Sequence, residues 1–461
     1  MLRINVKNMK KMLVKGILPV GIISLIFCAF FNLNLGLGFL VAIIYGIFVM
    51  GLNGESITKL IKFIIKEIIS YWEIYLVVLL LGANIASWMS SGILAQMMYL
   101  GLSVINVDNY CIVAFLITAL VAIFMGTGLG TLSTIGLVFI GIGKSLGFNI
   151  ALVVGLLVSA SYIADILSPM SLLLNLNLKS NEIKYKNYLR KFFPYLFGSV
   201  VITLLLYILV FSNQIISFEV GYTLELQKAI VNFFNINYFM LLIPILNIVL
   251  AVIGINLSVN FIASIIVGSV FSIIMQGNSI VNQITYLIKG YYPNNMSNQI
   301  SLFFNGGGIF GTANIVFIIA MALAFAFLLN YSGSLKRIKR NFIRGKKPMQ
   351  VLVGNALFSI FMTSVGCDQS LGILIPSKES KLDYENLGWK KEKLSADISA
   401  SGVIIAPIEP WNVNALVIFG FTGISALQFG QYAYICFIMP IWMIVYNYLV
   451  NIFRKKQNEI F

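Results

Sequence analysis

The sequence contains no histidine, and only 10% of its 461 residues are charged. A soluble domain usually has about 25% charged residues, whereas 59% of this chain is hydrophobic. A water-soluble fold cannot cover that much apolar surface. The apolar runs are long and continuous, unlike the short alternating segments of a membrane β-barrel. The composition therefore predicts an all-α polytopic membrane protein and excludes soluble enzymes, nucleic-acid binders and secreted disulfide scaffolds.

The missing side chains also limit the chemistry. Without histidine, the commonest proton shuttle and transition-metal ligand is absent, so proton transfer near neutral pH must use carboxylates. All four cysteines lie in apolar segments, which is typical of small buried side chains: Cys28, Cys111, Cys367 and Cys436. We expect no cofactor.

The net charge of +15 does not indicate nucleic acid, because the basic residues form short blocks between apolar runs. The expected partners are the lipid bilayer, a small cation and the proton, and the sequence leaves a homodimer open. With the N-terminus inside, 28 of the 31 Lys and Arg residues fall on the inner side, as the positive-inside rule requires. We predict a multi-pass protein of the cell membrane with both termini in the cytoplasm.

Two of the apolar runs contain glycine-rich breaks. These runs, 109–146 and 349–376, are interpreted as re-entrant hairpins, although two full spans in place of each would keep the same topology. The other ten runs are predicted to cross the membrane once. These lie near 16–33, 35–51, 73–100, 148–175, 192–212, 237–255, 257–276, 308–331, 398–424 and 430–452.

The two hairpins carry a weak internal repeat. The tripeptide Ile-Phe-Met stands at 123–125 and again at 360–362, and Pro169 and Pro407 follow at spacings of 46 and 47 residues. The first hairpin opens outside and the second inside, so the repeat is inverted, with discontinuous helices as in secondary transporters. Close packing of small residues is the alternative explanation.

This pattern predicts four regions. They are a basic cytoplasmic N-terminus (1–15), a first half (16–191) with hairpin 109–146 and broken helix 148–175, scaffold-type helices leading into the second half (192–331), and a second half (332–461) with hairpin 349–376 and broken helix 398–424.

Three acidic residues are predicted to lie at membrane depth: Asp165, Asp368 and Glu409. A carboxylate there costs several kcal/mol unless it is paired, hydrated or protonated, which suggests function, although each could be an interfacial or pore-lining acid with a structural hydrogen bond. Pro169 disrupts the turn after Asp165 and frees carbonyl oxygens, and hydroxyl and carbonyl oxygens suit a cation of the size of Na⁺. The three acids are therefore candidate Na⁺ ligands. The full set of candidate ion- and substrate-binding residues is Asp165, Ser161, Ser168, Ser171, Thr127, Thr131, Asp368, Gln369, Glu409 and Asn412.

Several stretches match a known family in order along the chain. They are 86–92 (Ala-Ser-Trp-Met-Ser-Ser-Gly), 126–136, 161–171, 305–308 (Asn-Gly-Gly-Gly), Asp368-Gln369, Ala406-Pro407 and 410–412 (Pro-Trp-Asn). In these residues the sequence resembles the NhaC-type sodium/proton antiporter family. The resemblance implies an ion-transporter-superfamily fold, with a transport domain that holds both hairpins against a scaffold. It also implies exchange of cytoplasmic Na⁺ for external H⁺.

The sequence departs from the family pattern at two places. The family has a second acid after the serine that matches Ser171, but Leu172 stands here, and Glu409 replaces a residue that is usually apolar. The leading hypothesis is a cation/proton antiporter with no enzymatic activity. The alternatives are an organic acid or amino-acid exchanger on the same fold, a membrane enzyme, or a membrane protein that transports nothing.

Overall fold

The computed structural model describes residues 16–31, 33–214, 220–293, 296, 301, 303–332, 342–343 and 347–460. The backbone of this part is helical, apart from turns, connections and one isolated antiparallel bridge between Tyr291 and Gly306. The prediction of an all-α protein is confirmed. The predicted basic N-terminus at 1–15 lies outside the described residues.

Nine helical segments of the described chain are long and apolar enough to cross a membrane, or up to eleven if each sharply bent pair counts as one span. One bent pair joins α14 to η2 and α15 at 96°, and the other joins α24, η4 and η5 to α25 at 41°. These numbers agree with the predicted ten or so spans. The nine segments are α3 (Leu35–Leu52), α5 (Trp72–Ser90), α8 to α9 (Gly128–Ser145), α10 to α11 (Ile150–Leu167), α13 (Tyr185–Ser212), α16 (Leu257–Gln276), α19 (Ile309–Tyr331), α21 (Pro348–Gly366) and α27 (Tyr434–Ile460).

The broken spans consist of short helical pieces, and further short helices complete the described chain. They are α2 (Ile17–Phe30), α4 (Ile57–Ser70), α6 (Ile93–Val104), α7 (Tyr110–Met125), α8 (Gly128–Thr131), η1 (Leu132–Gly136), α9 (Leu137–Ser145), α10 (Ile150–Ser161), α11 (Ile163–Leu167), α12 (Leu172–Ser180), α14 (Val220–Phe233), η2 (Tyr238–Leu241), α15 (Leu242–Val252), α17 (Ile280–Lys289), α22 (Gln369–Glu379), α23 (Lys381–Asn386), α24 (Lys391–Ile398), η4 (Ser399–Val403), η5 (Ala406–Ile408), α25 (Val413–Thr422), α26 (Ala426–Phe429) and η6 (Gly430–Tyr432).

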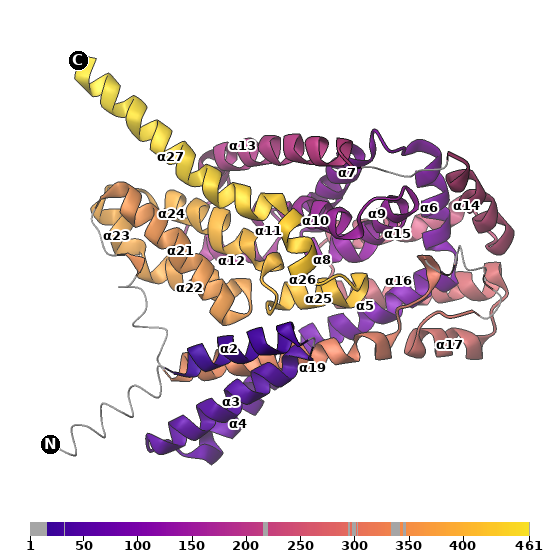
Figure 1. Ribbon diagram of the computed structural model, residues 1–461, viewed down its shortest axis with the longest axis horizontal. Helices are drawn as coiled ribbons and strands as arrows, with labels where there is room; N and C mark the ends of the chain where they lie inside the picture. The colour runs from indigo at the N-terminus through magenta and orange to yellow at the C-terminus, as the bar shows by residue number, and fades with distance from the viewer. Residues whose placement is uncertain are drawn as a thin grey trace.

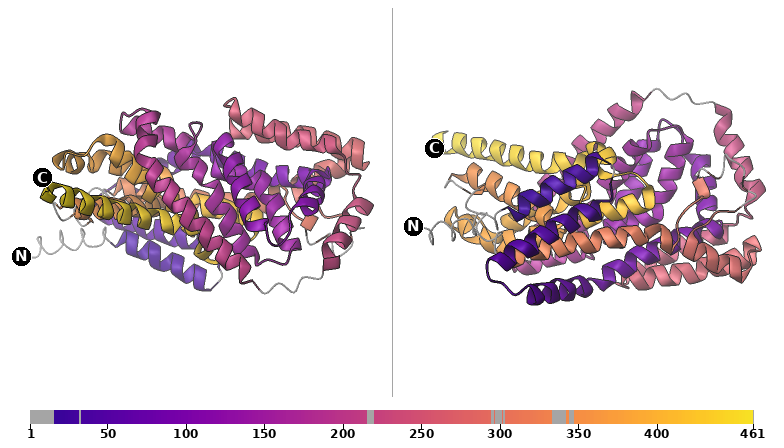
Figure 2. Two further views of the ribbon diagram at one scale, coloured as in Figure 1. Left: turned by 90° about the horizontal axis from the view of Figure 1, so that it is seen from above. Right: turned by 60° about the horizontal axis from the view of Figure 1, so that its bottom comes forward.

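The helices form two groups (Figures 1 and 2). In the lower part of Figure 1, α19 packs against α3, α4 and α5, and α5 packs against α16. The upper part holds the broken helices, with α13 and α27 packed side by side. The two groups meet where α25 packs on α5 and α19. This contact lies beside the candidate site.

The glycine run at 306–308 lies against α5. The Gly308 amide donates to the Gly82 carbonyl oxygen at 2.7 Å, and a Cβ added to Gly307 would lie 2.7 Å from the Ala86 nitrogen. Side chains are therefore excluded at this crossing, which explains why glycines occupy it.

The first hairpin turns at Gly126. Helix α7 ends there with a left-handed φ of 73°, and Thr127 caps the start of α8. The returning arm passes the beginning of α7, because the Tyr110 hydroxyl donates to the Phe139 carbonyl oxygen at 2.7 Å. The two arms are therefore antiparallel, as in a re-entrant hairpin.

The second hairpin has the same form. Helix α21 ends at Cys367, whose φ is 55°, and Asp368 caps α22. The arms are antiparallel, and the Ser359 hydroxyl donates to the Gly372 carbonyl oxygen at 2.7 Å. In Figure 1, α21 and α22 approach the centre from the left, whereas α7 and α9 lie on the right. The hairpins thus enter from opposite ends, as the inverted repeat requires.

The backbone gives the register of this repeat. Gly126 and Cys367 are both left-handed, and Thr127 and Asp368 after them are both extended N-caps. Each pair is separated by 241 positions. The first half of the chain therefore maps onto the second by this offset.

The same offset relates the breaks in the two broken helices. In the first, α11 ends at an extended Ser168 and α12 is capped by Ser171. In the second, η5 ends at an extended Glu409 and α25 is capped by Asn412. Glu409 therefore occupies the position that corresponds to Ser168.

The alignment proposed from the Ile-Phe-Met repeat is wrong by four residues at the tripeptide and by three at the proline. It paired Pro169 with Pro407, whereas the structure pairs Pro169 with Pro410. Three or four residues are about one helical turn, so a helix shifted by this amount presents nearly the same face. The repeat could therefore be recognised from the sequence although its register was not.

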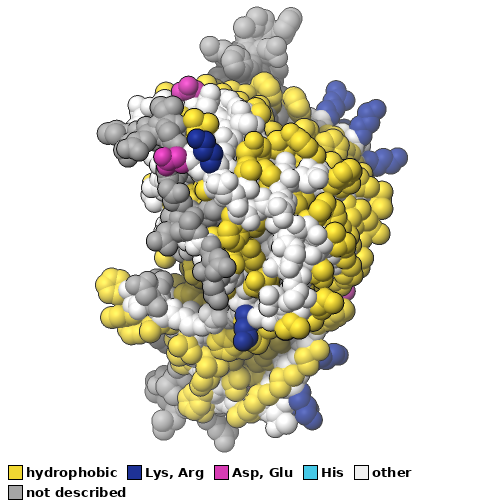
Figure 3. All heavy atoms as spheres, turned by 90° about the vertical axis from the view of Figure 1, so that its right-hand side faces the viewer, with side chains coloured by type: hydrophobic (Ala, Val, Ile, Leu, Met, Phe, Trp, Pro, Cys, Tyr) yellow, Lys and Arg dark blue, Asp and Glu magenta, His cyan; other side chains and the backbone are white. Residues whose placement is uncertain are grey.

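Large apolar side chains are exposed on the outer helices, including Ile266 (59%), Leu205 (56%) and Phe48 (61%). Figure 3 shows one end of the molecule, where apolar side chains dominate and the basic ones stand at a few separate places. The exposed apolar side chains of the outer helices are suited to contact with lipid chains.

Candidate functional site

Asp165 lies in α11 of the first broken helix, beside the tip of the first hairpin. Its side chain is 6% exposed, and its Oδ1 accepts a hydrogen bond from the Gly128 amide at 3.3 Å. The Gln369 side chain also donates to Asp165. The carboxylate is therefore held by a backbone amide of the first hairpin and by a residue at the start of α22 in the second.

A series of amide side chains continues from Gln369. Its Oε1 accepts from Asn414 Nδ2 at 3.1 Å, and Asn414 Nδ2 also donates to Asn412 Oδ1 at 3.0 Å. Asn412 Nδ2 then donates to Glu409 Oε2 at 3.1 Å. These residues form a continuous hydrogen-bonded connection between Asp165 and Glu409, which we call the amide bridge (Gln369, Asn414 and Asn412).

Glu409 lies inside the protein, with 7% of its side chain exposed. Ser364 of α21 donates to its other oxygen, and the Trp411 indole donates to the Ser364 carbonyl oxygen at 2.9 Å. The equivalent Ser168 in the first repeat donates to the carbonyl of Ile123 on α7 at 2.6 Å. Each broken helix therefore binds the first arm of its own hairpin at corresponding positions.

Asp368 is placed differently from the other two acids. It is only partly buried and caps α22 by accepting from the Ser370 amide at 3.0 Å. Burial and, secondarily, the charge of Asp368 raise the pKa of Tyr71, which lies between α4 and α5. Among the described residues, no group of three acidic or cysteine side chains could hold a metal ion together. The three acids therefore do not form a single cage.

The candidate hydroxyl groups mostly bind the backbone near these breaks. Ser171 donates to the Asp165 carbonyl oxygen at 3.3 Å and caps α12, while Thr127 caps α8. Ser161 and Thr131 bond to carbonyls one turn earlier in the chain, at 3.3 and 2.9 Å. The structure thus brings Thr127, Ser168 and Ser171 to the breaks beside Asp165.

Sequence reasoning missed two members of the network. Tyr162 is completely buried and donates to Asn414 Oδ1 at 3.0 Å. Tyr162 lies within the family-matching stretch 161–171, and Asn414 lies two residues after the Pro-Trp-Asn stretch. These positions were the available signals, but only the fold brings the two residues together across 252 positions.

The sequence also failed to predict the burial of Asp397. It lies in the segment 377–397, which reads as a charged cytoplasmic surface, yet its side chain is fully buried. Lys393 approaches it at 3.1 Å, and the hydroxyls of Tyr384 and Tyr195 donate to it at 2.8 and 3.0 Å. The spacing of Lys393 and Asp397 by four residues on a helix was the available signal.

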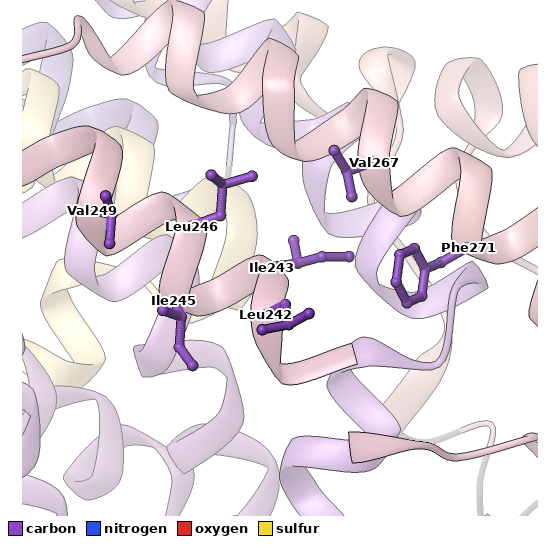
Figure 4. Close-up of a pocket in the computed structure, with 7 residues that line it drawn as sticks. All are labelled: Leu242, Ile243, Ile245, Leu246, Val249, Val267 and Phe271. Carbon is purple, nitrogen blue, oxygen red and sulfur yellow. The ribbon is translucent and has the colours of Figure 1, made fainter. Parts of the chain in front are cut away.

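A separate apolar hollow lies between α15 and α16 (Figure 4). Its volume is about 400 Å³, and its lining contains only apolar side chains, among them Leu246, Val267 and Phe271. It contains no acid or amide and lies apart from the network around Asp165.

Comparison with known proteins identifies the class of this arrangement. The sequence pattern of the Na⁺/H⁺ antiporter family matches residues 162–450, more than half of the chain. The chain belongs to the Na⁺/H⁺ antiporter family. Membership in this family makes it a secondary active transporter, and the match includes Asp165, Gln369, Glu409 and the amide bridge.

Three relatives show the range of this family. The malate-2H⁺/Na⁺-lactate antiporter of Bacillus subtilis is 25% identical over 414 residues, which cover 88% of each chain. The Na⁺/H⁺ antiporter NhaC of Alkalihalophilus pseudofirmus is 25% identical over 384 residues, or 82% of each chain. The arginine/ornithine antiporter ArcD of Halobacterium salinarum is 22% identical over 368 residues, which cover 79% of this chain and 76% of the relative.

Proposed function

We propose that this protein exchanges cytoplasmic Na⁺ for external H⁺, and that Asp165 binds the two ions alternately. The observation that carries this proposal is a buried carboxylate at the junction of a broken helix and a hairpin tip, bonded to Gly128 and Gln369. Such a group in a membrane is stable only when it is paired, hydrated or protonated.

The same physics couples the two ions. When Asp165 is ionised, Na⁺ neutralises it, and when Na⁺ leaves, a proton must do so. Moving a bare carboxylate through the apolar interior costs several kcal/mol, so movement without either ion is suppressed. Exchange therefore follows from one negative charge that must be neutralised in both directions.

Neutral oxygens beside Asp165 would complete the Na⁺ site. The hydroxyls of Ser168, Ser171 and Thr127 and the carbonyls freed by the break at Pro169 are ligands of the required hard type. Each hydroxyl binds backbone in this structure, so ion binding would require local rearrangement. Glu409 is proposed to act through the amide bridge and not as a direct ligand of the same ion.

Exchange of an organic acid or amino acid is less well supported, although two relatives carry such names. Among the described residues, no lysine or arginine pairs with Asp165 or Glu409. A substrate carboxylate could bind a helix N-terminus. In this structure, however, the Gly128 amide of the first hairpin already donates to Asp165, and Asp368 caps the N-terminus of α22 in the second hairpin. The site therefore favours a cation.

We further propose that the protein resides in the cell membrane with both termini in the cytoplasm, because 28 of 31 basic residues then lie inside. The cargo ions are its substrates, and the proposal requires no cofactor. The sequence leaves a homodimer open.

The decisive experiment is ion exchange in proteoliposomes. A pH-sensitive dye inside the vesicles reports proton movement after addition of Na⁺, Li⁺, K⁺, malate or arginine. We expect a response to Na⁺ that Asp165→Asn abolishes, while Glu73→Gln, an exposed acid in the first turn of α5, retains it. A response to malate or arginine in the absence of Na⁺ would favour the exchanger alternative.

A further inference from the structure

A column of neutral polar side chains leads away from Asp165 along α12. Ser171, at the start of this helix, donates to the Asp165 carbonyl oxygen. Further along, polar side chains of α12, α22 and the α24–η4 segment face one another, each at most 4% exposed. We call these residues the polar column: Asn177, Asn181, Ser377, Ser380, Ser395 and Ser399.

Hydrogen bonds show that these side chains form one group. Asn177 Nδ2 donates to the Ser395 carbonyl oxygen and to Ser399 Oγ, both at 2.9 Å. Asn181 Nδ2 donates to Ser377 Oγ and to Asn177 Oδ1, both at 2.9 Å. The column therefore joins the second half of the first broken helix to the returning arm of the second hairpin.

Two hydroxyls in the column have no hydrogen-bond partner among the described atoms. Ser380 Oγ and Ser395 Oγ are both completely buried. Ser395 lies one turn before Ser399, which Asn177 contacts, and Ser380 lies one turn after Ser377, which Asn181 contacts. A buried polar group without a partner is destabilising, so these two hydroxyls are suited to bind water or an ion.

The column ends at the surface beside an ion pair. Lys391 lies 2.5 Å from Glu182, and their side chains are 36% and 72% exposed. Lys391 also lowers the pKa of Glu182 below its ordinary value through a hydrogen bond and its charge. Lys391 stands one turn before Ser395 on the same helix, so this end of the column lies close to solvent.

The other repeat provides an internal control. At the offset of 241 positions, Asn177 corresponds to Ile418, Ser395 to Val154 and Ser399 to Val158. Ser377 and Ser380 correspond to Gly136 and Phe139. Close helix packing alone would favour small residues in both halves. Asn181 corresponds to Thr422, which is also polar, but the other five positions are polar in one half only. The fold itself therefore does not require polar side chains at those five positions.

We propose that the polar column is the path by which monovalent cations and water move between Asp165 and the membrane face that carries Lys391 and Glu182. The path is closed in this structure by contacts between its own side chains. Its hydroxyl and amide oxygens can replace part of a cation's hydration shell. The proposal rests on the proposed function, because it assumes that Asp165 binds a transported cation.

The test uses a cysteine as a probe of access. Ser395→Cys is made in a background in which Cys28, Cys111 and Cys436 are changed to Ala and Cys367 to Gly. Ag⁺, a small cation, is added in chloride-free buffer to one face of proteoliposomes during Na⁺/H⁺ exchange. It reacts with a thiol to form a silver thiolate and release a proton. Val154→Cys, at the corresponding position of the other repeat, is the matched control.

We expect Ag⁺ to block exchange by the Ser395→Cys variant only when it is added on the face that carries Lys391. This block should be about tenfold faster than the block of the Val154→Cys variant, because opening of the path exposes position 395 and leaves position 154 buried. Na⁺ should slow the block. The proposal is overturned if exchange continues unaffected through Ser395→Cys at saturating Ag⁺, or if both variants are blocked equally from either face.

A second variant distinguishes failure of the proposed path from failure of the proposed function. Asn177→Leu should reduce the exchange rate about tenfold while equilibrium Na⁺ binding, measured by calorimetry in detergent, changes by less than about twofold. Residual exchange in Asp165→Asn would refute the proposed function. Loss of exchange in Asp165→Asn together with a normal rate in Asn177→Leu would refute the path alone.

Discussion

Asn414 Nδ2 lies 3.1 Å from Gln369 Oε1, so the second broken helix is hydrogen-bonded to the returning arm of the second hairpin. Gln369 in turn donates to Asp165 of the first broken helix. Together with the Gly128 bond to Asp165, these contacts connect both broken helices and both hairpins. Loss of the hydrogen bond between Asn414 and Gln369 should therefore change the surroundings of both Asp165 and Glu409.

Asn414→Leu should reduce exchange by at least about tenfold and destabilise the protein by about 1–3 kcal/mol, because Gln369 and Asn412 lose buried partners. The measurements are exchange in proteoliposomes and thermal unfolding in detergent. Tyr162→Phe removes only the hydroxyl bond to Asn414 and should cost about 1 kcal/mol. Equal effects of the two variants would contradict a bridging role for Asn414.

Protons and Na⁺ should compete for Asp165. A carboxylate that holds either ion binds Na⁺ less well as the pH falls, so the apparent KM for Na⁺ should rise by up to about tenfold for each pH unit on the acidic side. The measurement is the Na⁺ dependence of exchange at a series of pH values. A maximal rate that falls with an unchanged KM would show that the proton acts elsewhere.

Glu409→Gln should lower the affinity of Asp165 for both Na⁺ and the proton, because it removes a nearby buried negative charge. We expect the Na⁺ affinity to fall several-fold, equivalent to about 1 kcal/mol. The active range should then extend to lower pH. Exchange with an unaltered Na⁺ affinity and pH profile would leave Glu409 with a structural role through Ser364 and Asn412 alone.

The two hairpin tips should respond in opposite ways to substitution. Gly126→Ala places a Cβ at a left-handed φ and 2.7 Å from the Met170 Cβ, which should cost more than about 1 kcal/mol. Cys367 adopts the same conformation without being glycine, so Cys367→Gly should be stabilising or neutral. Thermal unfolding of the two purified variants compares them directly, and a lower midpoint for Cys367→Gly than for Gly126→Ala would contradict the strain argument.

Lys393→Met should be strongly destabilising, because it leaves Asp397 buried without its cation. Removal of one partner of a buried pair typically costs about 3–5 kcal/mol. The double variant Lys393→Met with Asp397→Leu removes both charges and should recover part of this loss. The check is the unfolding midpoint of the three proteins, and a double variant no more stable than Lys393→Met would argue against an uncompensated charge as the cause.

The sequence by itself determined the class and the outline of this protein. The high proportion of apolar residues requires a helical fold embedded in a membrane, because so large an apolar surface is unfavourable in water. Glycine and proline marked the breaks at Gly126 and Pro169, since these residues permit or impose the backbone that ends a helix. An acid within an apolar run, as at Asp165, marked the candidate site through its desolvation cost.

The tertiary structure decided what the acids contact. Gln369, Asn414 and Tyr162 come from distant parts of the chain, and nothing in local spacing shows that they meet. Asp397 reads as a surface residue because its burial depends on how α13, α21, α22 and α23 pack around α24. The register of the repeat was also undecidable from sequence, because a shift of one helical turn preserves the face of each helix. Local chemistry therefore predicts which groups are unusual, and only the packing of distant helices determines which of them are partners.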